Sequence, residues 1–259
     1  MSHISFDTIG NIAVINAPFL KADERKKLKK KAQELLKRNK NIKSIFVKSK
    51  ISGKLRIPKL SWLAGKKDSK TIYKEHGCLM KLDIKTCYFS PRLSTDRLEI
   101  AKKIKKGKVL VMFSGIAPYP IIIAKYSKAK KIYAIELGRE ASRYAQENIK
   151  LNKIKNIVLI QGDVKKIVPK LARRLKFDAI VMARPQLKET FLKEAFLVSK
   201  KGTMIYYYDF QPKKFMHETL DTIEREAKKA NKKIKILEFK RVREIAPYKY
   251  HIRIDFKIL

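Results

Sequence analysis

Short apolar runs alternate with amphipathic stretches through the second half of this chain. Five runs have the length of buried strands, at residues 109–113, 132–135, 157–161, 178–182 and 203–208. Between them, apolar residues recur at helical spacing over residues 120–126, 140–151, 164–175 and 188–198. Repeated strand–helix units of this length predict an α/β fold with a doubly wound parallel sheet.

The pattern changes toward the C-terminus. A helical face is predicted first, formed by Met216, Leu220, Ile223 and Ala227. Residues 234–239 and 251–258 then read as strands, and the second of them alternates strictly between apolar and polar residues. We expect these two strands to close the parallel sheet as an antiparallel pair.

The first 85 residues predict a smaller α/β unit. Strands are expected at residues 11–17 and 42–47, with an amphipathic helix at 23–38 between them. Residues 50–58 contain glycine and proline and are expected to form a loop, whereas 71–75 and 78–83 read as strands paired across Gly77. We place the domain boundary near residues 83–88, giving domains at 1–85 and 86–259. The second domain opens with a helix through Ile104 that Ser94 or Thr95 could cap.

A glycine loop and an acidic strand end give the first chemical signal. Gly115 follows the strand at 109–113, and Glu136 ends the next strand about 20 residues further on, a spacing at which a carboxylate can bind a ribose diol. A single glycine does not make the pyrophosphate-binding fingerprint. We therefore expect S-adenosylmethionine (SAM), which has a ribose and no phosphate, rather than a dinucleotide. The structural alternative is a plain pair of buried strands.

The charge of the chain indicates a polyanionic partner. Its 63 lysines and arginines face 24 acidic residues, which leaves a formal net charge of +39 on 259 residues. Such a field attracts polyanions and accelerates encounter with them. We expect nucleic acid, bound in part by the first domain, because the acidic residues that normally balance surface lysines are missing. The alternative is a lysine-rich solvated face.

Several other classes are disfavoured. No apolar run reaches the roughly 20 residues needed to span a bilayer, and the first ten residues lack the layout of a signal peptide, so we expect a cytoplasmic protein that does not bind membranes. The two cysteines and four histidines are scattered, which argues against a metal site or a disulfide framework. So large a like charge also favours a monomer in the absence of RNA.

Segments from end to end of the chain match the pattern of one family. The matching segments are residues 6–13, 51–56, 71–78, 88–97, the glycine loop, Glu136, 147–152, 162–163, 206–208 and 243–247. The run Tyr-Phe-Ser-Pro-Arg-Leu-Ser-Thr at 88–95 is the most specific. Together they resemble the archaeal and eukaryotic tRNA (guanine37-N1)-methyltransferases and their wyosine-pathway relatives. The resemblance implies a Rossmann-like class I SAM-dependent methyltransferase domain, in a short form without the N-terminal domain of longer members.

The resemblance also implies an activity and catalytic residues. The activity is methylation of N1 of guanine 37 in tRNA, next to the anticodon. A base must take the N1 proton and a cation must stabilise charge on O6, and the family pattern places these roles at Asp96 and Arg56. Asp96, where relatives have glutamate, could instead satisfy backbone N–H groups at a helix start, and Arg56 could be an ordinary surface cation. Arg184 and Pro185 occupy the motif that helps hold the target nitrogen.

The cofactor contacts implied by the resemblance surround the glycine loop. Glu136 is expected on the ribose hydroxyls and Asp163 near the adenine amino group, although Asp163 could simply form a turn. Arg97 matches a cofactor-side position, with a structural salt bridge as its alternative. The neighbouring positions expected to line the SAM site are Phe113, Gly115, Leu137 and Val164.

Three departures from the family pattern keep alternatives open. Val111 and Ala117 stand where the first motif usually has aspartate and a second glycine, and Ala183 stands where asparagine is usual. A bifunctional enzyme that also methylates C7 of 4-demethylwyosine is one alternative. Transfer of the aminocarboxypropyl arm of SAM to that base is another, although this chain keeps the methyltransferase form of residues 88–95. The third is a tRNA-binding protein on a degenerate scaffold.

Overall fold

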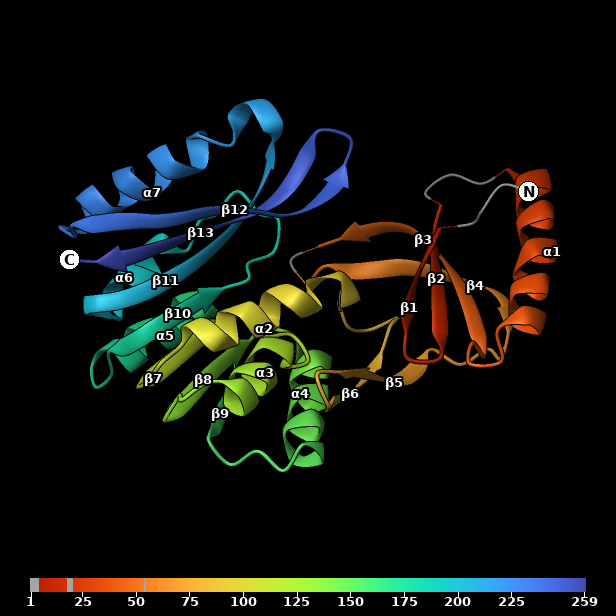
Figure 1. The fold of residues 1–259 in the computed structure, drawn as a ribbon, viewed down its shortest axis with the longest axis horizontal. Coiled ribbons are helices and arrows are strands. Elements are labelled where there is room, and N and C mark those ends of the chain that lie inside the picture. The colour runs from red at the N-terminus through yellow and green to blue at the C-terminus, as the bar shows by residue number, and fades with distance from the viewer. Residues whose placement is uncertain (1–4, 18–20, 54) are drawn as a thin grey trace.

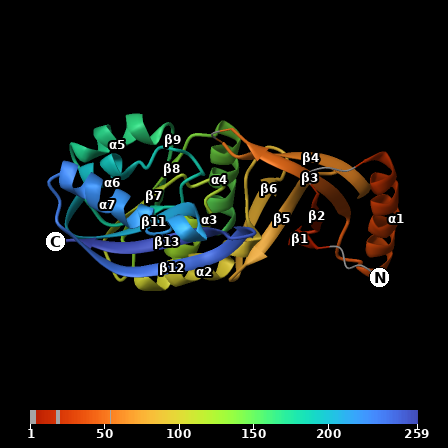
Figure 2. The same cartoon turned by 90° about the horizontal axis from the view of Figure 1, so that it is seen from above.

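A seven-stranded sheet forms the larger of two lobes that lie side by side along the long axis of the molecule (Figures 1 and 2). The computed structural model describes residues 5–17, 21–53 and 55–259. The strand order is β12-β13-β11-β10-β7-β8-β9. The strands are β7 (Lys108–Met112), β8 (Lys131–Glu136), β9 (Ile157–Gln161), β10 (Phe177–Met182), β11 (Ser199–Pro212), β12 (Ile234–Ala246) and β13 (Lys249–Ile258).

The sheet is parallel from β7 to β11 and closes with an antiparallel pair. Val111 of β7 lies opposite Ala134 of β8 and Val181 of β10, in register with both neighbours. Strand β13 runs antiparallel to β11 on one side and to β12 on the other. The predicted doubly wound sheet and its antiparallel closure are both confirmed.

Helices cover both faces of this sheet (Figure 1). One face carries α2 (Ser94–Lys103), α3 (Pro118–Tyr126) and α4 (Arg139–Leu151), and the other carries α5 (Val164–Ala172), α6 (Leu192–Leu197) and α7 (Glu218–Lys229). Val109 and Val111 of β7 pack into the first layer, whereas Leu110 and Met112 pack into the second. A central parallel strand is buried on both faces, which explains its continuous apolar sequence. In the part of the chain that is described, no helix has the length and apolar character to cross a membrane.

The smaller lobe is a four-stranded sheet with one helix on it. Its strands, in sheet order, are β1 (Phe6–Ile9), β2 (Ile12–Asn16), β3 (Ser44–Ser52) and β4 (Ile57–Gly65). Helix α1 (Ala22–Arg38) connects the parallel strands β2 and β3 and buries Ala32 against them. The predicted strand–helix–strand unit is present. The loop predicted over residues 50–58 is wrong at both ends, because β3 and β4 extend into it as a hairpin.

A hairpin of β5 (Lys70–Glu75) and β6 (Cys78–Asp83), paired as predicted, connects the lobes. Asn148 of α4 and Asn152, the C-cap of that helix, hold β6. The Asn148 side chain accepts from the N–H of Lys81 at 2.7 Å and donates to its carbonyl at 3.0 Å, and Asn152 bonds both backbone groups of Leu79 in the same way. These bonds account for the 147–152 segment of the family pattern. The domain boundary at residue 85 stays a prediction.

Two predicted helix starts and the predicted burial of one strand differ from the structure. Neither Ser94 nor Thr95 caps α2, because the 3-10 turn η1 (Pro91–Leu93) runs directly into it and Leu93 takes the N-cap position. Helix α6 begins at Leu192 rather than at residue 188, since Phe191 has a left-handed φ of 58°. Strand β13 is buried on both faces, not one, because helix α2 covers its polar side chains Arg253 and Asp255.

Candidate active site

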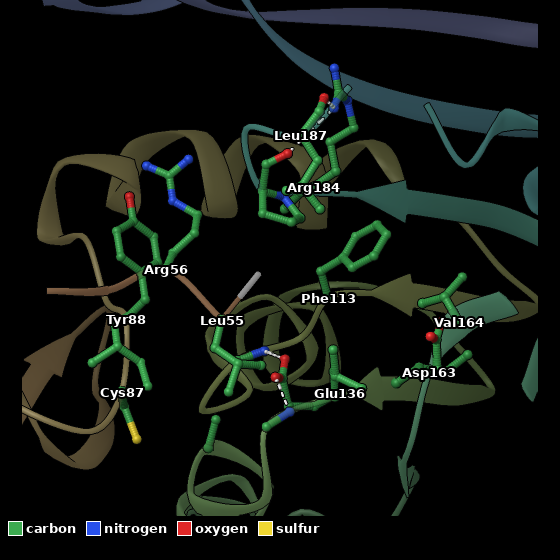
Figure 3. A pocket seen from close by; sticks show the side chains of 18 of the residues that line it. Leu55, Arg56, Cys87, Tyr88, Phe113, Glu136, Asp163, Val164, Arg184 and Leu187 are labelled. Carbon is green, nitrogen blue, oxygen red and sulfur yellow. Dashed lines mark hydrogen bonds between the residues drawn. The ribbon is translucent and has the colours of Figure 1, made fainter. Parts of the chain in front are cut away.

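A cavity of about 470 Å³ lies where the carboxyl ends of the parallel strands meet (Figure 3). Strand β7 leads to β8 on one side and has β10 on its other side, so this is the point at which the strand order reverses and where ligands bind in open α/β sheets. Nine of the eleven predicted site residues line the cavity: Arg56, Phe113, Gly115, Glu136, Leu137, Asp163, Val164, Arg184 and Pro185. The structure does not bring Asp96 or Arg97 to it.

Glu136 is held rigidly at the end of β8. One carboxylate oxygen accepts from the N–H of Gly115 and the other from the N–H of Gly138, each at 2.7 Å (Figure 3). Burial raises the pKa of Glu136, while these backbone N–H groups act in the opposite direction. A side chain at Gly138 would crowd the carboxylate, since an added Cβ would lie 3.1 Å from Oε1. The unused lone pairs of a fixed carboxylate suit a pair of hydroxyl donors.

The loop after β7 turns through left-handed backbone conformations. Phe113, Gly115 and Ala117 have φ values of 62°, 57° and 70°. The N–H of Ser114 donates to the carbonyl of Ile135 at 2.9 Å, which ties the loop to the neighbouring strand. Ala117, at the position of the expected second glycine, is the N-cap of α3 and is fully buried. The loop therefore keeps its left-handed turn although the second glycine is missing.

Asp163 and Val164 begin α5 on the far side of the cavity. Oδ1 of Asp163 accepts from the N–H of Lys165 at 2.9 Å, so the aspartate caps the helix. Val164 is buried and gives the cavity an apolar wall, together with Phe113, whose ring meets that of Phe191 edge-on at 4.8 Å. Leu137 lines the cavity but is well exposed. A capped carboxylate between apolar walls can accept from a purine amino group.

Arg56 extends from the smaller lobe between two aromatic rings. Its guanidinium carbon lies 4.9 Å from the centre of the Tyr88 ring and 5.1 Å from that of Phe210. Its Nε is buried and has no hydrogen-bond partner among the described residues. Cation–π contacts hold the guanidinium in place and leave its N–H donors available.

The Arg184 side chain holds its own loop in place through an ion pair and hydrogen bonds. Its guanidinium forms a buried ion pair with Asp209, donates to the Tyr208 carbonyl at 3.0 Å and donates to the Leu187 carbonyl at 2.8 Å. These bonds fold residues 184–189 beside the cavity and present Pro185 to it. Arg184 therefore shapes the wall, and its donors are not free to replace the missing asparagine.

Asp96 lies inside a buried polar network rather than in the cavity. Its Oδ1 accepts from Arg253 at 2.5 Å, and its Oδ2 accepts from the hydroxyls of Tyr119, at 2.8 Å, and Tyr208. Burial and then the charge of Asp96 raise the pKa of Tyr119 well above its usual value, so that hydroxyl stays a donor. The carboxylate is thus fully engaged away from the place where a base would be needed.

Arg97 forms a buried structural salt bridge, which was the alternative to a cofactor contact. Its Nε and Nη2 form a two-point ion pair with Glu75, at 2.6 and 2.5 Å, and both groups are buried. The guanidinium also donates to the Ser90 carbonyl at 3.2 Å. This pair fixes the β5–β6 hairpin to α2, and Arg97 does not line the cavity.

His251 lines the cavity and was missed by the sequence interpretation. It is 4% exposed, and neither ring nitrogen has a hydrogen-bond partner among the described residues. Its ring stacks on Phe210, with centroids 4.4 Å apart and planes 8° from parallel. Burial, with Arg243, Arg56 and Arg184 adding to it, lowers the pKa of His251 to about 3. The signal was present in the polar residues 251, 253 and 255, which alternate with apolar residues in this strand.

A second cavity of about 670 Å³ lies between the lobes and shares Arg56, Tyr88 and Phe210 with the first. It is lined by the cations Lys48, Arg56, Arg92 and Arg243. Arg92 pairs with Asp7 at 2.6 Å, whereas Lys48 and Arg243 form no ion pair with any described residue. Burial, opposed by Asp7 and assisted by the nearby arginines, lowers the pKa of Lys48. Such an excess of cations favours an anionic ligand.

The strand order and the site at the switch point define a class I SAM-dependent methyltransferase fold. No group of histidine, cysteine, aspartate and glutamate suited to a metal ion occurs among the described residues. Residues 71–237 match the TRM5/TYW2 methyltransferase domain, and residues 2–69 match the TYW2 N-terminal domain. The chain belongs to the TRM5/TYW2 methyltransferase family.

Named relatives carry more than one activity. The chain is 37% identical to tRNA (guanine(37)-N(1))-methyltransferase Trm5b of Pyrococcus abyssi, over 98% of this chain and 74% of the relative. It is 34% identical to tRNA (guanine(37)-N(1))/4-demethylwyosine(37)-methyltransferase Taw22 of Nanoarchaeum equitans, over 99% and 100%. An aminocarboxypropyltransferase of Methanocaldococcus jannaschii that acts on 4-demethylwyosine(37) in tRNA(Phe) is 31% identical, over 98% of each chain.

Two similar solved structures contain a tRNA or adenosine. A complex of aTrm5 with tRNALeu superposes with a TM-score of 0.85 at 30% identity, over 99% of this chain and 72% of that one. Trm5 of Methanocaldococcus jannaschii in complex with adenosine superposes with a TM-score of 0.82 at 30% identity, over 99% and 74%.

Proposed function

We propose that this protein methylates N1 of guanine 37 in tRNA, with SAM as the methyl donor. The observation that carries the proposal is the meeting of the two cavities. The cavity built around Glu136 shares Arg56, Tyr88 and Phe210 with a neighbouring cavity lined with cations. A nucleoside cofactor and an RNA nucleotide could therefore meet at one point.

The residues around the first cavity fit SAM. Glu136 would hold the ribose hydroxyls, and Asp163, between the apolar walls of Phe113 and Val164, would accept from the adenine amino group. Gly115 brings the loop backbone close to the cofactor. When bound, SAM supplies an electrophilic methyl group on a sulfonium ion.

Arg56 would act on the target base. A guanine that loses its N1 proton gathers negative charge on O6, and a preorganised cation stabilises that charge in a site from which water is excluded. The rings of Tyr88 and Phe210 hold the guanidinium, so little reorganisation is needed when the charge develops. The adjoining wall, presented by Pro185, would keep the base in place.

The role of Asp96 as the base that takes the N1 proton stays a prediction. In the structure its carboxylate is bound by Arg253 and two tyrosines. To reach a base in the cavity it would have to leave three partners, one of them charged. We therefore favour a positioning role, in which Asp96 fixes Tyr208 beneath His251, whose ring centroid lies 5.3 Å away.

Two enzymatic alternatives share this site. The double activity in the name of the Nanoarchaeum relative keeps methylation of 4-demethylwyosine open, and the Methanocaldococcus relative does the same for aminocarboxypropyl transfer. A monomer acting in the cytoplasm remains our expectation, because a net charge of +39 opposes self-association without RNA.

Mass spectrometry of nucleosides would test the proposal. Two tRNA transcripts, one unmodified and one carrying 4-demethylwyosine at position 37, are incubated with the protein and SAM. We expect guanosine to gain the mass of one methyl group. The same gain on the tricyclic base would add the second activity, and a gain of one aminocarboxypropyl group would replace the assignment. No gain on either RNA, with no SAM binding, would favour an RNA-binding scaffold.

A further inference from the structure

His251 is a buried polar group whose hydrogen bonds none of the described residues satisfies. It sits in β13 directly opposite Phe210 of β11, and both ring nitrogens lack partners among the described residues. Leaving a buried polar group unpaired destabilises the folded state. A phenylalanine at this position would stack on Phe210 without that cost. The imidazole therefore points to a ligand that completes its hydrogen bonds.

The surroundings of His251 fix its chemical form. The charged side chains that face it are the arginines 56, 184 and 243, and they disfavour a further positive charge. The ring is accordingly neutral, with one N–H donor and one acceptor nitrogen. Because arginine has only donors, the imidazole adds a side-chain acceptor to this corner of the cavity.

We propose that His251 reads the target base, its neutral ring nitrogen accepting a hydrogen bond from the 2-amino group of guanine. Arg56 and His251 both contact the Phe210 ring and both line the cavity around Glu136, so a donor and an acceptor belong to the wall of one cavity. The edge of guanine likewise has an acceptor, O6, and a donor, the 2-amino group. A contact with the 2-amino group leaves N1 free to be methylated. The proposal rests on the proposed function and adds the residue that selects guanine.

The test compares tRNA transcripts with guanosine or inosine at position 37, because inosine differs only in lacking the 2-amino group. Single-turnover methylation and RNA affinity are measured for the wild type, His251→Phe and His251→Gln. The wild type should prefer guanosine by roughly tenfold or more, since the inosine complex leaves a buried acceptor unpaired. His251→Phe should reduce that preference to about one by slowing only the guanosine substrate. His251→Gln, which retains an acceptor, should recover part of it.

Ser142→Ala is the matched control. The Ser142 hydroxyl is another buried group without a partner among the described residues, but it lies on α4 and lines neither cavity. It should leave the preference for guanosine unchanged. A preference that persists in His251→Phe, with folding verified by thermal unfolding, would overturn the proposal.

The two proposals can fail separately. If the wild type methylates neither transcript, the proposed function fails, and RNA affinity then decides the role of His251. The wild type must still bind the guanosine transcript more tightly than the inosine transcript, and His251→Phe must bind both equally. Equal binding of the two transcripts by the wild type would exclude base reading by His251. SAM affinity should be the same in all variants.

Discussion

Arg253 of β13 and Asp96 of α2 form a buried ion pair, with Nη1 of the arginine 2.5 Å from Oδ1 of the aspartate. The same guanidinium bonds to Asp255, and two tyrosine hydroxyls donate to the second oxygen of Asp96. Every strong interaction of this carboxylate is therefore directed into the protein. The pair joins α2, which begins within the family segment at 88–97, to the last strand of the sheet.

Asp96→Asn should first affect stability. The substitution removes one of the negative charges that pair with Arg253. It also places an amide N–H group where Asp96 now accepts hydrogen bonds. We therefore expect the free energy of unfolding to fall by about 2–3 kcal/mol. Urea unfolding would measure this, with Asp221→Asn on the exposed face of α7 as the control. The opposite result would be unchanged stability with a methyl-transfer rate at least 100-fold lower, which is the effect of losing a general base.

Glu136→Ala should weaken SAM and spare RNA. The substitution removes a charged acceptor that the N–H groups of Gly115 and Gly138 hold in place. We expect SAM binding to lose about 1.5–3 kcal/mol, the usual contribution of a hydrogen bond to a charged group. Titration calorimetry would measure SAM, and filter binding would measure tRNA. Glu147→Ala, which lines neither cavity, is the control, and an equal loss in both variants would refute the ribose contact.

Asn148→Ala should loosen the hairpin between the lobes. The asparagine is fully buried and bonds both backbone groups of Lys81 as well as the carbonyl of Ile116. Losing three buried hydrogen bonds should lower the free energy of unfolding by about 2–4 kcal/mol. Asn156→Ala, which loses a single bond to the Ala129 carbonyl, should cost no more than about 1 kcal/mol. Similar losses in the two variants would show that β6 does not depend on α4.

The parallel core of the sheet could be read from the sequence because its signal is local. Strand β7 is buried on both faces, so its residues form one apolar run. The apolar run of the next strand ends directly before Glu136, which marks this residue as the strand end. Strand β4 was missed because its first six residues alternate only between exposed and half-buried. Leu60 and Trp62 do alternate with Lys59 and Ser61, but this run is short and directly follows Pro58, which indicated a loop.

The site was only partly predictable because some of its partners come from distant segments. Asp96 meets Arg253 across 157 positions of the chain, and no local pattern shows that this pairing takes the carboxylate away from the cavity. His251 enters the site only through the register that places it opposite Phe210. Glu136 and Gly115, by contrast, belong to one strand–helix–strand unit, and sequence spacing was enough to bring them together.

Acid should unfold the protein partly through Glu99. Burial raises the pKa of this carboxyl, but hydrogen bonds from Arg253, Lys240 and Lys103 outweigh burial and lower it to about 2. A carboxyl with a lowered pKa stabilises the fold at pH values above its ordinary pKa of 4.5. This stabilisation is lost as the pH falls toward 2. Glu99→Gln should therefore be less stable than the wild type at pH 6, and the difference should shrink toward pH 3. A pH-independent difference, or an equal effect of the exposed control Glu34→Gln, would contradict this.

Arg243→Ala should weaken RNA binding through charge. Arg243 lines the cavity between the lobes, forms no ion pair with any described residue, and has a pKa that burial lowers. An anion bound there would relieve the repulsion among Arg243, Arg56 and Arg92. If that anion is an RNA phosphate, the substitution removes one phosphate contact, so the slope of log affinity against log salt should become shallower by about one. The affinity for SAM should not change.

Lys193→Ala on α6, which lines neither of the two cavities, removes the same charge and should leave the slope nearly unaltered. Equal slopes for Arg243→Ala and the wild type would mean that the cations of this cavity do not contact the RNA backbone, and that the tRNA approaches the cavity around Glu136 from another side.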